Sequence, residues 1–376
     1  MHASRFFTIL AALAGHAYPQ RLATALSSQE VVVYADYSPN SIPMLFHRPT
    51  GSASAANVNT QRASFINPAL LYDPGTEFKN GSASFDYTSL SPDLKLREGH
   101  AELTYQTHGF GASLQQDFNG RGSILALDAN GTRTGEKDVK TQSQSLSIAK
   151  ALPATAGLSH HVGVTLRHVL SPGTYENYGY DRHGYMLDIG YFGKIGECFG
   201  LGASVDNLGH QPDVIRTVIE RTASQDGSVR ISEGYLVEDY PLNPQRINFG
   251  MGFGNRWTYR GFGLLGTQIN STYTREFGRK DFGLGRDIFV FETDEELLHT
   301  LVSGFGMLHE KRGDAHKFDL GLRFFNHFLI EYSYSNSDRS DVGSQKTFVM
   351  EFQNLLSWNG SDARWWRADR EPGQTP

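Results

Sequence analysis

The sequence predicts an all-β protein, a transmembrane antiparallel β-barrel of about 14 strands with an irregular, plug-like segment near its N-terminus. Apolar residues recur at every second position over most of the chain, which is typical of strands with one apolar face. No stretch beyond the N-terminal region approaches the ~18–20 apolar residues of a membrane-spanning helix. The chain is also rich in Gly (40), Phe (24) and Tyr (17), as suits a wall with aromatic residues outside and small ones inside.

The alternation is clearest over residues 245–254, where apolar side chains alternate with Asn or Gly. The apolar positions are Ile247, Phe249, Met251 and Phe253. The same pattern recurs over 317–324, 328–335 and 348–353, and in weaker form between 83 and 205. Successive side chains of a strand point to opposite faces, so these segments have one oily and one wet face. A soluble β-sandwich also alternates, but the uninterrupted series of strands and the charged second face favour a barrel.

The chain divides into four predicted parts. Residues 1–25 resemble a secretory signal peptide, with Arg5, a short apolar run and small residues at candidate cleavage sites; the alternative is a buried N-terminal helix. Residues 26–78 form the plug-like segment, and residues 79–356 form the barrel. Residues 357–376 form a C-terminal tail with Trp365, Trp366 and three arginines.

Two short helical elements are expected between strands. Residues 213–219 lie in the long charged connection 210–244, and their apolar pairs recur four apart, as in an amphipathic helix. Thr293 and Glu296 have the spacing of a capping box, which predicts a helical turn before a strand near residue 297.

Composition excludes several classes of function. The net charge of −6 and the lack of a clustered basic run argue against a nucleic-acid partner. The single cysteine, Cys198, cannot form an internal disulfide. No set of serine, histidine and acid stands out as a nucleophilic site, so we expect neither catalysis nor a cofactor. We also expect no metal site, because His161 and His168 fall on opposite faces of one strand.

Charged residues on the wet face of the strands are expected to line the barrel lumen. The charges singled out are Arg167, Asp319, Arg323, Glu331 and Glu351. They could pair across neighbouring strands into a structural ladder. They could instead form a constriction that selects solutes, as charged rings do in pores.

Three motifs carry a resemblance to a known family. The first is Asn67-Pro68-Ala69, near the start of the mature chain. The second is an ordered series on predicted strands, formed by Arg167, Asp188-x-Gly190 and Asp206-Asn207-x-Gly209. The third is Pro241, shortly before the strand that contains Ile247. In order and placement these motifs resemble the PorV/PorQ family, a branch of the FadL-like outer-membrane barrels. The chain departs from that family at residues 57–64, which replace a Gly-rich stretch, and in the tail that follows its last strand.

The resemblance implies an exported protein in the outer membrane of a Gram-negative-type bacterium, surrounded by lipid. A PorV/PorQ-type barrel would be a non-catalytic accessory to type IX-like secretion or cell-surface attachment. Its partners would be secretion proteins or exported cargo, and the 210–244 connection could serve as the docking surface. The alternative is a FadL-like channel for hydrophobic small molecules such as long-chain fatty acids, in which Asn67-Pro68-Ala69 belongs to the plug.

Overall fold

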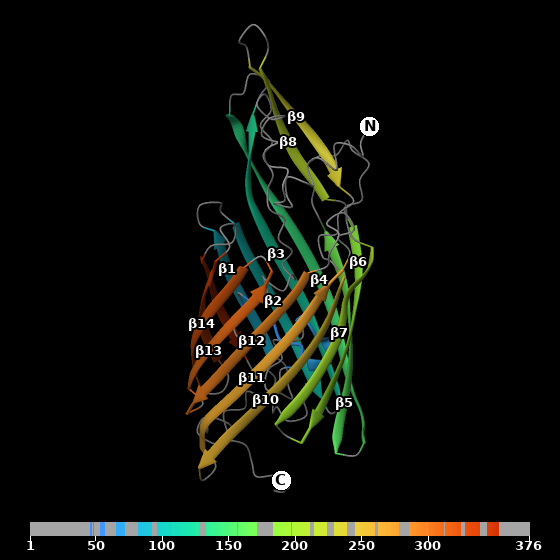
Figure 1. Cartoon of the computed structure of the whole chain (residues 1–376), viewed down its shortest axis with the longest axis vertical. Coiled ribbons are helices and arrows are strands. Elements are labelled where there is room, and N and C mark those ends of the chain that lie inside the picture. The colour runs from blue at the N-terminus through green and yellow to red at the C-terminus, as the bar shows by residue number, and fades with distance from the viewer. Residues whose placement is uncertain are drawn as a thin grey trace.

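The architecture is a closed, all-antiparallel barrel (Figure 1). The computed structural model describes residues 46, 48, 53–56, 65–71, 82–91, 96–107, 109–127, 133–155, 157–170, 183–196, 198–210, 214–223, 229–238, 245–259, 262–277, 286–298, 300–311, 313–324, 328–338 and 344–352. Its elements are the 3-10 helix η2 (Pro68–Leu71) and the strands β1 (Ser82–Ser91), β2 (Leu96–Thr107), β3 (Phe110–Leu127), β4 (Arg133–Thr155), β5 (Leu158–Leu170), β6 (His183–Ile195), β7 (Phe199–His210), β8 (Val214–Ala223), β9 (Val229–Glu238), β10 (Arg246–Tyr259), β11 (Phe262–Glu276), β12 (Arg286–Leu297), β13 (Leu301–Glu310), β14 (Gly313–Phe324), β15 (Phe328–Ser337) and β16 (Ser344–Phe352).

The strands follow one another around the barrel, and β1 pairs with β16 to close it. The closing register places Ala83 opposite Phe352 and Ser89 opposite Lys346. Strands β8 and β9 leave the wall as a separate two-stranded hairpin, so β7 pairs directly with β10. The barrel therefore has 14 strands, which confirms the predicted fold class and strand number.

The outer face of the wall is apolar. Phe249 is 54% exposed and Leu320 is 47% exposed, whereas their neighbours Asn248 and Asp319 are fully buried. This alternation continues along the strands, as the sequence pattern predicts. In the described part of the chain, no helix is long and apolar enough to cross a bilayer. The outward row of aromatic and aliphatic side chains matches the lipid-facing band of a transmembrane barrel.

The two ends of the barrel differ in the length of their connections. Tight turns at one end use left-handed glycines, such as Gly109 (φ 77°) and Gly157 (φ 79°). We call this the short-turn end. The opposite, long-connection end carries the 12-residue link between β5 and β6 and the whole excursion between β7 and β10. The β8–β9 hairpin extends from this end, as do the elongated parts of β3 and β4 (Figure 1).

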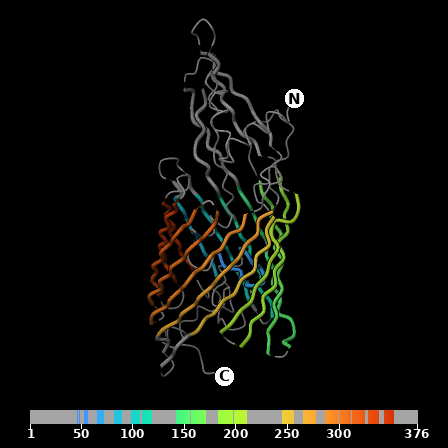
Figure 2. Tube along the Cα trace, viewed as in Figure 1, coloured from blue at the N-terminus to red at the C-terminus, as the bar shows by residue number. Residues whose placement is uncertain are grey.

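The interior contains a further piece of the chain. We call residues Phe46, Arg48, 53–56 and 65–71 the inner segment; its blue trace lies within the barrel (Figure 2). Buried apolar residues of the inner segment and the wall form one cluster. Its members are Phe46, Ala53, Ala55, Phe65, Ile66, Ile288, Val290, Leu308 and Ala315. The wall residues of this cluster occupy inward positions of β12–β14 that would otherwise face a polar lumen, so the main core lies inside the barrel.

Both predicted helical elements are wrong. Residues 214–223 form strand β8, which pairs with β9; several β-branched residues here favour an extended backbone. Thr293 and Glu296 lie inside β12, where Thr293 pairs with Ile269 on one side and Phe305 on the other. A helical turn would break both ladders. The chain turns instead at Leu298, whose φ is 52°.

The lipid-facing assignment predicts a depth-dependent cost of charge. Leu320→Arg should destabilise the barrel by about 2–4 kcal/mol, because it places a cation in the apolar band. The matched change Asn336→Arg lies on an exposed position at the end of the neighbouring strand and should cost at most about 1 kcal/mol. Denaturant titration of both variants refolded into vesicles measures the difference, and equal costs would contradict the assignment.

Candidate functional site

The inner segment rests on a row of glycines on the inner wall. Because they lack a side chain, the main chain of the segment comes into direct contact with the strands. A Cβ at Gly202 would lie 1.8 Å from the carbonyl oxygen of Ala55, and one at Gly163 would lie 2.3 Å from the carbonyl carbon of Pro68. We name this row the glycine cradle. Its members are Gly163, Gly190, Gly202, Gly250 and Gly252 of β5, β6, β7 and β10.

Asn67 joins two parts of the inner segment to the wall. Its fully buried side-chain amide donates to the carbonyl oxygens of Ala55 (2.8 Å) and Tyr191 (2.9 Å). Its Oδ1 accepts from the backbone N–H of Ala69 (3.1 Å), which starts the turn into η2. Asparagine suits this position because one side chain supplies both the two donors and the acceptor. We call the contact between the inner segment and the inner wall the seat. The predicted Asn67-Pro68-Ala69 element lies at its centre.

Wall side chains satisfy other main-chain groups of the inner segment. Thr272 of β11 accepts from the N–H of Ala55 (2.9 Å), and Ser204 of β7 donates to the carbonyl of Ile66 (2.5 Å). Gln106 of β2 donates to the carbonyl of Leu71. A buried irregular backbone needs such partners, since it has no ladder of its own. The seat therefore uses wall residues that are far apart in the sequence.

Arg48 anchors the other side of the inner segment through charge. Its guanidinium lies 2.8 Å from Glu98 Oε1 and 3.6 Å from Asp117 Oδ1. It also stacks over the ring of Phe65, with 4.6 Å between Cζ and the ring centroid. His100 contacts the same Asp117 carboxylate at 2.7 Å. Glu98, His100 and Asp117 are all buried, so the cluster is sensitive to the loss of a member.

Lys317 of β14 supplies a second charged anchor. Its Nζ donates to Glu292 Oε1 (2.6 Å) and to the backbone carbonyl of Arg48 (2.9 Å). The ammonium also lies 5.0 Å from the ring centroid of Phe46. The same side chain thus neutralises a buried carboxylate and holds the inner segment against β14.

The second motif is assembled around a bulge between β6 and β7. Arg167 donates to Asp188 Oδ2 and Asn207 Oδ1, both at 2.8 Å, and Asp188 Oδ1 accepts from the N–H of Asn207 (2.7 Å). Asn207 has a φ of 61° and Gly209 a φ of 132°, and the register shifts at this point. Asp206 lies beside this group and accepts from Asn248 (2.6 Å). Arg167 therefore links β5 to β6 and β7 through side-chain contacts on the inner wall.

The remaining predicted charges lie on β14, β15 and β16. Asp319 and Glu331 are buried on the inner face of β14 and β15. Arg323 pairs with Glu296 (2.8 Å) at the short-turn end, and Glu351 is half-buried near the end of β16. Pro241 lies outside the described residues, as do the predicted signal peptide and C-terminal tail.

The histidines do not converge. His161 faces inward against Phe192, whereas His168 faces outward and shares a 2.9 Å hydrogen bond with His183. Among the residues that the structure describes, no three or more His, Cys, Asp or Glu side chains are grouped to hold a metal ion.

Sequence reasoning missed Arg48 and its partners Glu98, His100 and Asp117. Arg48 precedes the strands in an irregular stretch, so no periodicity marks it. Glu98, His100 and Glu102 occupy every second position of β2 on its inner face. This alternation could have indicated a buried charged cluster. The partner on the inner segment could not be identified in this way, because it lies 50 residues from Glu98.

The glycine cradle predicts a steric effect on the seat. Gly202→Ala should displace Ala55, because the added Cβ would overlap its carbonyl. Amide hydrogen exchange of 65–71 should then become faster by about tenfold or more, as expected for a local loss of about 1.4 kcal/mol. Gly99→Ala is the matched control, since its Cβ would meet only an ordinary contact at 3.8 Å. Unchanged exchange in Gly202→Ala would show that the segment is not seated there.

The charged anchor predicts a second effect. Lys317→Met removes the cation beside the buried Glu292 carboxylate and should cost about 3–5 kcal/mol. Adding Glu292→Gln should recover much of that loss, because the buried charge is then removed too. Lys346→Met, on an exposed position of β16, is the control and should change little. Unfolding midpoints of the four proteins in detergent measure the effect, and a neutral Lys317→Met would refute the anchor.

Comparison with known proteins supports the fold. No protein-family model matches the chain, and no curated protein matches it. Among solved structures, the chain is similar to the toluene transporter TodX of Pseudomonas putida, with a TM-score of 0.50 and 13% identity over 80% of this chain and 95% of that chain. It is similar to the toluene transporter TbuX of Ralstonia pickettii, with the same score and identity over 82% and 98%. At this identity the likeness concerns the fold alone, a closed antiparallel β-barrel.

Proposed function

We propose that the chain is a channel for small hydrophobic molecules in the outer membrane of a Gram-negative-type bacterium, with the inner segment as its plug. The observation that carries this proposal is the apolar cluster between the inner segment and the inner wall. Ile288, Val290 and Leu308 face inward and contact the inner segment. A simple diffusion porin has a polar, water-filled interior. An inward apolar patch instead offers a surface that a hydrophobic solute can share.

The solved structures with a similar fold support a hydrophobic solute. TodX and TbuX are described as toluene transporters, and the Asn67-Pro68-Ala69 motif also favours a channel for hydrophobic molecules. A solute of this kind gains free energy by burying apolar area, about 25 cal/mol per Å². It can therefore compete with Phe46 and Ile66 for the wall residues of the cluster. The polar anchors at Asn67 and Arg48 return the segment to its seat afterwards.

The two ends of the barrel suggest its orientation. Outer-membrane barrels have short periplasmic turns and longer extracellular loops. The long-connection end, with the β8–β9 hairpin, then faces the cell exterior. In this proposal residues 1–25 are the export signal, residues 26–78 contain the plug and residues 357–376 are a periplasmic tail. We assign no catalytic activity to the chain.

The PorV/PorQ-type role in secretion stays a prediction. It places the docking surface on the 210–244 connection, of which the structure describes the backbone pairing of β8 with β9. The described residues contain no feature that favours this role over the channel. The apolar seat and the fold neighbours favour the channel.

An uptake experiment tests the proposal. In intact cells that lack other hydrophobic-compound channels, expression of the chain should raise uptake of labelled toluene or oleate. Asn67→Ala removes two hydrogen bonds donated to carbonyls and should change this uptake while the barrel still assembles. The control Asn336→Ala, on the outer wall, should behave like the wild type. If expression leaves uptake unchanged and cross-linking in cells recovers secretion proteins, the channel is refuted in favour of the accessory role.

A further inference from the structure

The lipid-facing wall contains a hollow on strands β6, β7 and β10–β14. Two outward positions there carry small side chains, Ala203 and Ser271, where most others carry large ones. Ala203 lies between Tyr191 and Phe249 in the cross-strand register, and Ser271 lies between Met251 and Phe291. The resulting hollow has a volume of about 900 Å³. This volume lies within the range of small-molecule sites, about 300–1,000 Å³.

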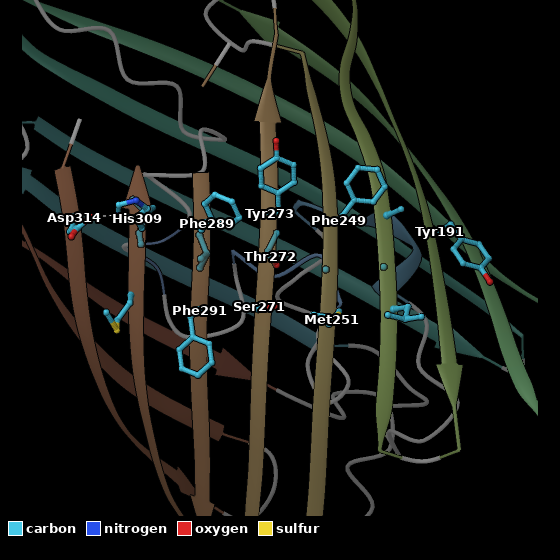
Figure 3. A pocket seen from close by; sticks show the side chains of 17 residues that line it. Tyr191, Phe249, Met251, Ser271, Thr272, Tyr273, Phe289, Phe291, His309 and Asp314 are labelled. Carbon is cyan, nitrogen blue, oxygen red and sulfur yellow. Dashed lines mark hydrogen bonds and ion pairs between the residues drawn. The ribbon is translucent and has the colours of Figure 1, made fainter. Parts of the chain in front are cut away.

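The walls of the hollow are apolar. Figure 3 shows aromatic side chains from neighbouring strands around it. Large apolar side chains that line it include Leu201, Phe249, Met251, Phe289, Phe291 and Met307. Methionine adapts its shape to irregular partners, and aromatic rings offer large apolar faces. Such a surface suits a hydrocarbon chain better than a rigid polar ligand.

One end of the hollow has a charged rim. Tyr273 Oη donates to Asp287 Oδ1 (2.7 Å), and Arg275 forms an ion pair with the same carboxylate. His309 Nδ1 contacts Asp314 Oδ1 at 2.6 Å on the adjacent strands (Figure 3). These residues stand where β11 and β13 end and where β12 and β14 begin, at the long-connection end. The rim therefore lies at the depth where lipid headgroups meet the apolar band.

We infer that the hollow binds an acyl chain of a phosphorylated lipid from the leaflet at the long-connection end, with the lipid phosphate at Arg275. The hollow opens toward the bilayer, so a lipid reaches it without any movement of the wall. The Arg275 side chain is about one-third exposed, and its guanidinium has five N–H donors. Asp287 fixes its orientation, and the remaining donors match phosphate oxygens. This inference depends on the transmembrane barrel and not on the proposed channel.

Lipid titration of the full chain tests the inference. Native mass spectrometry in detergent would compare dioleoyl phosphatidylglycerol with uncharged dioleoylglycerol, and we expect stronger retention of the former. Ser271→Phe fills the hollow and should lower binding of both lipids. Ser303→Phe, at a small outward position of β13 outside the hollow, is the matched control and should bind like the wild type. Arg275→Gln should weaken binding of phosphatidylglycerol by about tenfold, the loss of one charge-assisted contact, and leave dioleoylglycerol unchanged.

Heat-modifiable migration on gels shows which variants form the barrel, and Ala203→Leu replaces Ser271→Phe if the latter does not assemble. Equal lipid binding by the hollow-filling variant and the wild type would overturn the inference. Equal losses in Ser271→Phe and Ser303→Phe would overturn it as well. A dimer that forms without lipid and is lost in Ser271→Phe would assign the hollow to a second copy of the chain instead.

Discussion

The closing contact between β1 and β16 is the constraint on which the rest of the molecule depends. Hydrocarbon offers no partners to backbone N–H and C=O groups, so a membrane-spanning sheet must have no free edge. The register from Ala83–Phe352 to Ser89–Lys346 removes that edge. Closure in turn requires each strand to present one face to lipid and the other to the interior. It also leaves an enclosed space in which every polar side chain needs a partner.

The inner segment fills part of this space with two kinds of interaction. On the side of β5–β10 it uses main-chain contact with the glycine cradle and the hydrogen bonds of Asn67. On the other side it uses the ion pair of Arg48 with Glu98 and the hydrogen bond from Lys317 to the Arg48 carbonyl, together with an apolar cluster on β12–β14. The hydrogen bonds and ion pairs specify one position for the segment. The apolar cluster is the part of the seat that a hydrophobic solute can share, which connects the packing of the interior to the proposed transport.

The same part of the wall carries the glycine cradle on its inner face and the hollow on its outer face. On β7 and β10, Gly202 and Gly250 face inward as part of the cradle, while Ala203 and Phe249 face outward at the hollow. Gly202 and Ala203 are small residues that face opposite sides of β7, so the wall is thin at this point. The interior contact belongs to the proposed channel, and the exterior contact belongs to the inferred lipid. The two sites lie on the same strands but on opposite faces of the wall, so a substitution can alter one site without altering the other.

The sequence by itself determined the strand series, the lipid-facing phase and the inward phase of residues such as Arg167, Asp319 and Glu331. It could do so because alternation is a property of neighbouring residues, and a strand turns each one to a defined face. Only the tertiary structure decided that 214–223 is a strand, that Thr293 lies within β12, and that Asn67 reaches Tyr191 while Arg48 reaches Glu98. It also determined where the hollow lies on the outer wall, because the hollow arises from the register of several strands. Those features depend on closure and on contacts between distant residues, and no local pattern encodes which distant residues will meet.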